Sequence, residues 1–160
     1  MQGAHSVRPI IKRINMIEFE KNDGGREAAG YKGNARDCVA RSIAIAAERP
    51  YREVYDALAD GNANQRASSR TPKRSRSARN GVSVKRKWFK DYMQSLGFTW
   101  TPTMFIGSGC KTHLRADELP TGRIIVSLSK HYAAVIDGVL HDTYDCSRNG
   151  TRCVYGYWSK

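Results

Sequence analysis

Hydrophobic and polar positions along the chain change period, and the change separates a helical first half from a strand-rich last third. Residues 38–49 carry apolar or small side chains on almost every side, which predicts a buried helix that starts after Asp37 and stops before Pro50. Residues 51–60 repeat apolar side chains at helical spacing and predict a second, amphipathic helix. The first half should therefore place two consecutive helices against a common core.

A third helix is predicted downstream of a polar, glycine- and serine-containing stretch. Ser83 can cap this helix and Gly97 can end it, with its apolar face opposed by lysine and arginine. Residues 61–80 have no apolar period and consist largely of Ser, Arg, Asn and Ala, so they bury too little surface to offset the entropy of ordering. Residues 61–82 are therefore predicted to form a basic, mobile loop inserted between helices.

The last third of the chain has the alternation of strands. It predicts an antiparallel meander over residues 123–128, 131–136, 139–144 and 154–158. The clearest turn is Asp137-Gly138, because both residues accept the positive φ angles of a type I′ hairpin. Together these elements predict a single α+β domain over residues 1–160, in which an N-terminal helix packs on a C-terminal antiparallel sheet.

The predicted hairpin places a histidine beside a carboxylate. A two-residue turn pairs Ile136 with Val139, which makes His131 and Asp142 diagonal neighbours on one face of the sheet, about 7 Å apart at the backbone. A carboxylate at that distance can bind the imidazole and fix its tautomer. This is the arrangement that a general base requires when a nucleophile lies on its other side.

Cys38 is the candidate nucleophile. It lies in the first turn of the predicted buried helix, where free backbone N–H groups and the helix dipole stabilise a thiolate. Asp37 is predicted to cap the helix and to direct its carboxylate toward those backbone donors. The order Cys, His, Asp along the chain predicts a catalytic triad of Cys38, His131 and Asp142.

These residues resemble the papain-like cysteine peptidase superfamily, especially the leader peptidases of bacteriocin-exporting transporters. The Asp-Cys pair at 37–38 with its small-residue helix and the segment 131–136 match two motifs of that superfamily, and the whole chain is similar to a group of short phage and prophage proteins. The resemblance implies a papain-like fold and a thiol-dependent hydrolase or acyl transferase that acts on an amide bond of a protein or peptide. The family's oxyanion-hole glutamine position holds Lys32, so the nearest amide, Asn34, is the expected oxyanion donor.

The charge distribution adds a second class of function. The 160 residues carry 27 Lys and Arg against 15 Asp and Glu, a net charge of +12. Ten of these cations and no acid fall within residues 61–90: Arg66, Arg70, Lys73, Arg74, Arg76, Arg79, Lys85, Arg86, Lys87 and Lys90. Such a concentration predicts binding to a polyanion. The alternative to an enzyme is thus a module that binds nucleic acid or an acidic protein on an inactive papain-like fold.

The other cysteines permit two further interpretations. Cys110, His113, Cys146 and Cys153 could hold zinc, and a disulfide could join Cys146 to Cys153, but the spacing favours ordinary thiols, and no metal or cofactor is predicted. No apolar run approaches the roughly 20 residues that span a bilayer, and residues 1–8 lack the apolar core of a signal peptide. We therefore expect a cytoplasmic protein without a membrane partner.

Overall fold

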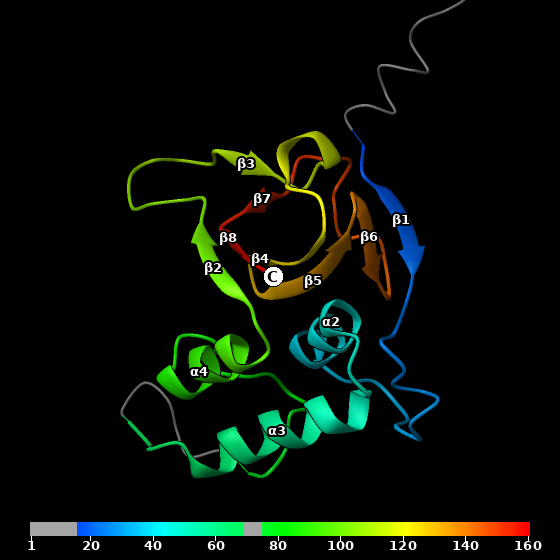
Figure 1. Ribbon diagram of the computed structural model, residues 1–160, viewed down its shortest axis with the longest axis vertical. Helices are drawn as coiled ribbons and strands as arrows, with labels where there is room; N and C mark the ends of the chain where they lie inside the picture. Colours follow the sequence, from blue (N-terminus) through cyan, green and yellow to red (C-terminus); the bar gives the residue numbers. More distant parts are fainter. Residues whose placement is uncertain (1–15, 69–74) are drawn as a thin grey trace, which may run out of the picture.

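The computed structural model describes residues 16–68 and 75–160, and this part of the chain has an α+β fold (Figure 1). The helices are α2 (Cys38–Ala47), α3 (Tyr51–Asn64), α4 (Lys87–Ser95) and the 3-10 turn η1 (Ala116–Glu118). The strands are β1 (Glu18–Lys21), β2 (Thr99–Pro102), β3 (Thr112–His113), β4 (Arg123–Leu128), β5 (His131–Ile136), β6 (Val139–Asp142), β7 (Cys153–Val154) and β8 (Gly156–Ser159).

Six strands form a mixed sheet in the order β1-β6-β5-β4-β8-β2. Three strands of the predicted meander are present, with β4 paired to β5 and β5 to β6. The predicted last strand, 154–158, is instead divided between β7 and β8, and β8 pairs with β4 rather than with β6. The prediction of a wholly antiparallel sheet is wrong at one edge, where β1 pairs with β6 in parallel. The N-terminal segment adds this edge strand, and its pairing partner lies more than a hundred residues away, beyond the reach of local sequence patterns.

The β5–β6 hairpin has the predicted register. Ile136 pairs with Val139, and the turn residues Asp137 and Gly138 have φ angles of 46° and 79°. The Asp137 carboxylate also accepts a hydrogen bond of 2.7 Å from the Gly122 N–H, which ties the turn to the start of β4. The positions of His131 and Asp142 are consequently fixed relative to each other by the backbone.

The sheet is covered on both faces, which divides the apolar residues between two cores. The helices pack on one face, and the segment from β3 to η1 together with β7 covers the other (Figure 1). The core on the helical side includes Ile43, Leu58, Phe89, Met93, Ile125, Tyr132, Ala134 and Trp158. The second core includes Leu114, Leu119, Ile124, Val126, Val135, Leu140 and Val154. Because α2 lies between β5 and α3, it is apolar around almost its whole circumference.

A single arginine fastens the end of α2 to the sheet. Arg123 of β4 donates hydrogen bonds of 2.9 Å and 2.6 Å to the carbonyls of Ala46 and Ile45, and it forms a 2.9 Å ion pair with Glu48. Carbonyls in the last turn of a helix lack the usual bond from four residues on, and here Ile45 otherwise accepts only a long bond of 3.4 Å from the Glu48 N–H among the described residues. A cation at this end is also favoured by the helix dipole. The C-terminus of α2 is therefore held against the middle of the sheet.

The second and third helices depart from their predicted bounds. Helix α3 continues to Asn64, so 61–64 are helical rather than part of a loop. Ser83 does not cap α4, which begins at Lys87, because the Ser83 carbonyl instead accepts the Arg86 N–H at 3.1 Å in a preceding turn.

Buried Asn62 organises the chain between α3 and α4. Its amide donates hydrogen bonds of 2.8 Å and 3.1 Å to the carbonyls of Ser77 and Gly81, and the Tyr55 and Ser77 hydroxyls lie 3.1 Å apart. Residues 75–82 of the predicted mobile loop are thus attached to α3, whereas 69–74 lie outside the described residues.

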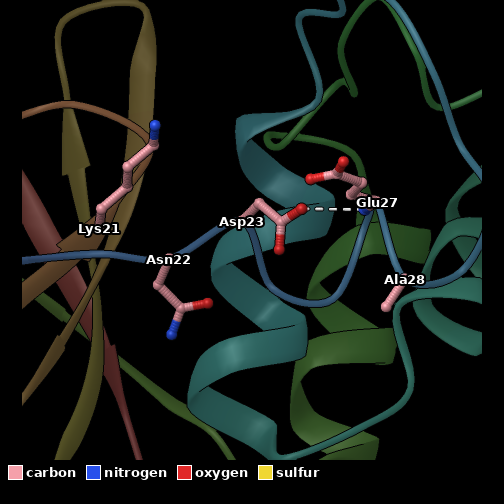
Figure 2. A pocket seen from close by; sticks show the side chains of 5 residues that line it. All are labelled: Lys21, Asn22, Asp23, Glu27 and Ala28. Carbon is pink, nitrogen blue, oxygen red and sulfur yellow. Dashed lines mark hydrogen bonds between the residues drawn. The ribbon is translucent and has the colours of Figure 1, made fainter.

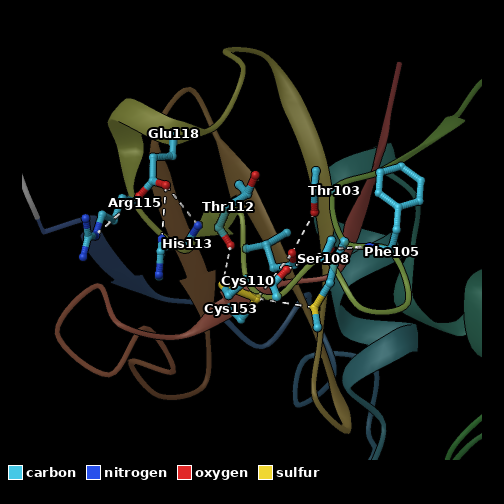
Figure 3. Close-up of a disulfide and its surroundings, with 12 residues drawn as sticks. Thr103, Phe105, Ser108, Cys110, Thr112, His113, Arg115, Glu118 and Cys153 are labelled. Atoms are coloured by element: carbon cyan, nitrogen blue, oxygen red, sulfur yellow. Dashed lines mark hydrogen bonds and ion pairs between the residues drawn. A yellow bond between two sulfur atoms is a disulfide. The ribbon is translucent and has the colours of Figure 1, made fainter.

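A disulfide joins Cys110 to Cys153, with a Cα–Cα distance of 5.8 Å (Figure 3). The expectation of ordinary thiols at Cys110 and Cys153 is therefore wrong, and the alternative pairing of Cys146 with Cys153 is not formed. The alternative zinc site is not assembled, because His113 bonds Glu118 at 3.2 Å and Cys146 is buried elsewhere. The disulfide links the segment between β2 and β3 to β7.

Shortening the buried side chain of Ile43 in α2 should lower the stability of the fold strongly. Ile43 is fully buried between α2 and its neighbours, so Ile43→Ala should reduce the free energy of unfolding by about 2–5 kcal/mol. Glu53→Ala is the control, since Glu53 is exposed and pairs only with exposed Arg49, and it should cost at most about 1 kcal/mol. Urea unfolding followed by circular dichroism measures both, and equal effects would contradict the packing described.

Candidate active site

Cys38 and His131 meet because α2 and β5 begin at the same end of the fold. Helix α2 packs on the face of the sheet that carries Tyr132 and Ala134, whereas alternation directs His131 and Asp142 toward the opposite face. His131 is the first residue of β5, so its imidazole can reach the Cys38 thiol past the end of the strand. Both side chains line one cavity of about 740 Å³.

The predicted pair of imidazole and carboxylate is formed. His131 Nε2 lies 2.6 Å from Asp142 Oδ2, and Asp142 is only 4% exposed. The other carboxylate oxygen accepts the Thr143 N–H at 2.7 Å. Because an ionised carboxylate can only accept, Nε2 is the protonated nitrogen of this bond. The other ring nitrogen is then left to exchange a proton with a thiol.

The surroundings of the three groups favour their charged forms. Burial opposes ionisation of Cys38, but the hydrogen bond and charge of His131, the Tyr132 N–H and the charge of Arg41 outweigh it and lower the pKa of the thiol. Burial also opposes the charging of His131, yet its bonds to Asp142 and the cysteines raise its pKa. The pKa of Asp142 is lowered, since bonding to His131 exceeds the effect of burial. The combined directions favour a thiolate beside an imidazolium at neutral pH.

A second thiol, Cys146, also lies beside His131, although the sequence suggested it only as a zinc ligand or a disulfide partner. Cys146 is 1% exposed, and burial together with the charge of Asp142 raises its pKa despite the opposing effect of His131. The same imidazole therefore lies beside one thiol that ionises easily and one that stays protonated. Cys38 is therefore the thiol more readily converted to the reactive thiolate.

Cys146 also completes a set of possible metal ligands. One ligand atom each of His131, Asp142 and Cys146 lies within 4.8 Å of the others. Imidazole, carboxylate and thiolate are all zinc ligands. In this structure, however, His131 and Asp142 use these groups to bind each other, and Cys146 keeps its proton. The arrangement as it stands is a hydrogen-bonded pair of His131 and Asp142, with the Cys38 side chain lining the same cavity as His131.

Asp37 does not cap α2, contrary to the prediction. Its carboxylate is 1% exposed and makes no bond to the helix backbone. It instead binds the guanidinium of Arg41 and the hydroxyl of Tyr51, and Arg26 Nε lies 3.1 Å from its Oδ2. Arg41 also approaches Asp142, at 3.7 Å between Nη2 and Oδ1. Asp37, the residue before Cys38, is thus connected through Arg41 to Asp142.

Asn34, the expected oxyanion donor, does not line the cavity that holds Cys38 and His131. It is exposed, and its main-chain carbonyl accepts a 2.7 Å bond from Arg79. The amide side chain that lines this cavity belongs to Asn80. Because Asp37 leaves the first turn of α2 uncapped, backbone N–H groups beginning with that of Cys38 are also open to an acceptor.

The ten predicted polyanion-binding residues do not form one uncompensated surface. Arg76 pairs with Asp60 and Lys87 with Asp91, each at 2.7 Å. Lys85 and Lys90 line cavities, and the Arg79 guanidinium bonds a carbonyl. The remaining members are Arg66 and Arg86, for which no ion pair with described residues is found, and Arg70, Lys73 and Arg74, which lie outside the described residues.

Another cavity, of about 570 Å³, lies along residues 21–28 (Figure 2). Asp23 accepts the N–H groups of Gly25 and Glu27 at 2.9 Å each. Burial raises the pKa of Asp23, but these backbone bonds outweigh it and lower the pKa overall. The carboxylate therefore shapes the loop between β1 and α2, and neither cysteine nor histidine lines this cavity.

Comparison with known proteins finds no relative: no family model, no curated protein and no solved structure matches the chain. The geometry of the site therefore has to carry the functional argument. Among the described residues, no helix has the length and apolar character needed to cross a bilayer.

Alkylation should reveal the contrast between the two free thiols. Because the pKa of Cys38 is lowered, its thiolate persists below the ordinary thiol range and should react with iodoacetamide at near-neutral or mildly acidic pH. In His131→Ala the favourable bond and charge are lost while burial remains, so labelling should move to higher pH. Peptide mass spectrometry of labelling rates measures this shift, and Cys146 serves as the slow internal control. A Cys38 profile unchanged by the mutation would contradict the assigned pair.

The buried Asp37 carboxylate should be important for stability. Asp37→Ala leaves two nearby arginines without their buried counter-charge and should lower the free energy of unfolding by about 3–5 kcal/mol. Tyr51→Phe removes a single hydrogen bond to the same carboxylate and should cost less, about 1–3 kcal/mol. Urea titration of the three proteins gives the ranking. Wild-type stability of Asp37→Ala would show that the network is not stabilising.

Proposed function

We propose that this protein is a thiol-dependent amide hydrolase or acyl transferase of the cysteine peptidase type, with a papain-like arrangement of Cys38, His131 and Asp142. One observation carries the proposal: His131 lies between the buried carboxylate of Asp142 and the thiol of Cys38, in an open cavity, and favours ionisation of that thiol. The nucleophile, the base and the residue that orients the base are thus all present with a site for a reacting carbonyl.

The chemistry begins with attack of the Cys38 thiolate on the substrate carbonyl carbon. A C–S bond forms, and the carbonyl electron pair moves to oxygen. His131 gives its proton to the amide nitrogen as the C–N bond breaks, and the amine leaves. The acyl group stays bound to the Cys38 sulfur as a thioester. Neutral His131 then takes a proton from water or from an acceptor amine, which attacks the thioester. Collapse of this second intermediate releases the product and the thiolate, and it leaves His131 protonated.

Other groups hold these reactants in place. Asp142 holds the imidazole by the 2.6 Å bond and favours its protonated form. The Cys38 N–H at the uncapped start of α2 is the proposed oxyanion donor, because it adjoins the attacking sulfur. Asn34 has no place in this proposal, since it does not line the cavity, and Asn80 is the amide positioned to help.

The competing function is binding without catalysis. A nucleic-acid or acidic-protein module on the same fold would need the cations of 61–90 but neither a nucleophile nor a base. A binding role leaves the lowered pKa of the Cys38 thiol without an explanation, because a thiolate contributes nothing to polyanion binding. The triad therefore favours the enzyme.

Turnover of a peptide library tests the proposal. The wild-type protein should generate new termini or other products of amide cleavage or transfer, detected by mass spectrometry, and Cys38→Ala should abolish them. His131→Ala should lower the rate about 10²–10⁴-fold, since it removes the general base. Cys146→Ser, which changes the neighbouring buried thiol, should retain turnover. Products that survive Cys38→Ala, or a wild-type protein that yields no Cys38-dependent product, would overturn the assignment.

A further inference from the structure

The cavity at Cys38 continues into a second one of about 430 Å³. Five residues line both: Val84, Lys85, Ser127, Tyr132 and Tyr155. Because they share these residues, the two cavities lie side by side, and we call the two together the groove. It runs from the triad to the aromatic residues of β2 and β8, so a molecule that reaches Cys38 can also contact those rings.

An aromatic platform closes the far end of the groove. Trp100 of β2 is 38% exposed, and its ring centroid lies 5.2 Å from that of buried Trp158. The platform depends on Gly156, because a Cβ there would lie 2.3 Å from Trp100 Cζ2. Glycine thus lets the indole lie against the backbone of β8 while leaving part of the ring open. Tyr155, 39% exposed, lines the same end.

The charge of the groove has one sign. None of the described residues that line the groove is acidic. Its charged lining residues besides His131 and Cys38 are the cations Arg36, Arg41, Lys85, Lys90 and Lys130. Arg41 is engaged by two carboxylates, but the three lysines are exposed and form no ion pair with described residues. Cations that are left without a counter-charge along a groove complement an anionic occupant.

On the basis of the proposed function, we infer that the substrate is an extended acidic polypeptide segment, with an aromatic side chain bound at Trp100 and carboxylates bound by Lys85, Lys90 and Lys130. Exposed rings of Tyr144 and Tyr155 line the groove together with Trp100, so rings and cations alone would also suit a single-stranded nucleic acid. The proposed chemistry at Cys38 requires an amide substrate, and this requirement favours the polypeptide. The reacting amide lies near Cys38, and residues on one side of it extend toward the platform.

Peptide binding to the full-length Cys38→Ala protein tests this inference without turnover. Three fluorescein-labelled peptides of equal length are compared. The first carries aspartates and one phenylalanine, the second replaces the aspartates by asparagines, and the third replaces the phenylalanine by alanine. Fluorescence anisotropy should give the acidic aromatic peptide at least tenfold tighter binding than either partner. Lys85→Ala combined with Lys90→Ala should weaken it about tenfold. Lys87→Ala is the matched control on the same segment, because Lys87 pairs with Asp91 outside the groove, and it should bind normally.

The platform has its own variants. Trp100→Leu should reduce the preference for phenylalanine over alanine while leaving the preference for aspartate over asparagine. Gly156→Ala should act in the same direction by displacing the indole with its ring intact. Two variants with different packing consequences guard against loss of folding, which circular dichroism checks in each. Equal binding of all three peptides to the folded protein would overturn the inference.

The outcomes also separate the inference from the proposed function. His131-dependent alkylation and turnover by wild type, combined with binding that ignores peptide charge, would overturn the substrate class alone. Selective binding to the groove with no Cys38-dependent product would support the occupant and refute the enzyme. A single-stranded oligonucleotide that binds more tightly than the acidic peptide, and whose binding is lost when Lys85→Ala and Lys90→Ala are combined, would identify a different occupant and overturn the inference.

Discussion

The burial of the Asp37 charge is the constraint on which the geometry of the site depends. A carboxylate that is 1% exposed must find partners inside the protein, and these come from three separate parts of the chain: Arg26 before α2, Arg41 within it and Tyr51 at the start of α3. The partners of this one carboxylate therefore fix the positions of the segment before α2, the first turn of α2 and the start of α3 relative to one another. The next residue is Cys38, so the position of the nucleophile follows from this network.

The opposite end of α2 is held by the guanidinium of Arg123. Arg123 reaches from β4 to carbonyls in the last turn of the helix, so the helix is held at its N-terminus by an anion and at its C-terminus by a cation from the sheet. The anion takes no backbone bond from the helix, because its oxygens are used by arginine and tyrosine. This leaves the N–H groups beside Cys38 open while the helix stays in place. A capping carboxylate would have held the same end but would have occupied those donors.

Local patterns sufficed for the pair of His131 and Asp142 because its geometry is local. The Asp137-Gly138 turn sets the hairpin register, and the register alone brings His131 to Asp142, as the 2.6 Å bond confirms. Features that depend on contacts distant in sequence escaped prediction: the parallel pairing of β1 and the disulfide between residues 43 positions apart. The role of Asp37 escaped for a related reason. Its residue type and position suit a helix cap, and only the fold supplies the arginine and tyrosine that compete for its oxygens.

The presence of two thiols at one imidazole shows why residue identity alone could not assign the chemistry. Cys146 lies four residues after Asp142, in the second core, where burial and the adjacent carboxylate both oppose a thiolate. Cys38 is also largely enclosed, but it faces the Tyr132 N–H and the charges of His131 and Arg41. His131 favours ionisation of both sulfurs, but burial raises the pKa of Cys146, and the charge of Asp142 adds to that effect. At Cys38 the bond and charge of His131, the Tyr132 N–H and the charge of Arg41 outweigh burial and lower the pKa of the thiol. In the proposed mechanism, Asp142 therefore orients the imidazole and also opposes a thiolate at Cys146, while burial does most to keep that second thiol protonated.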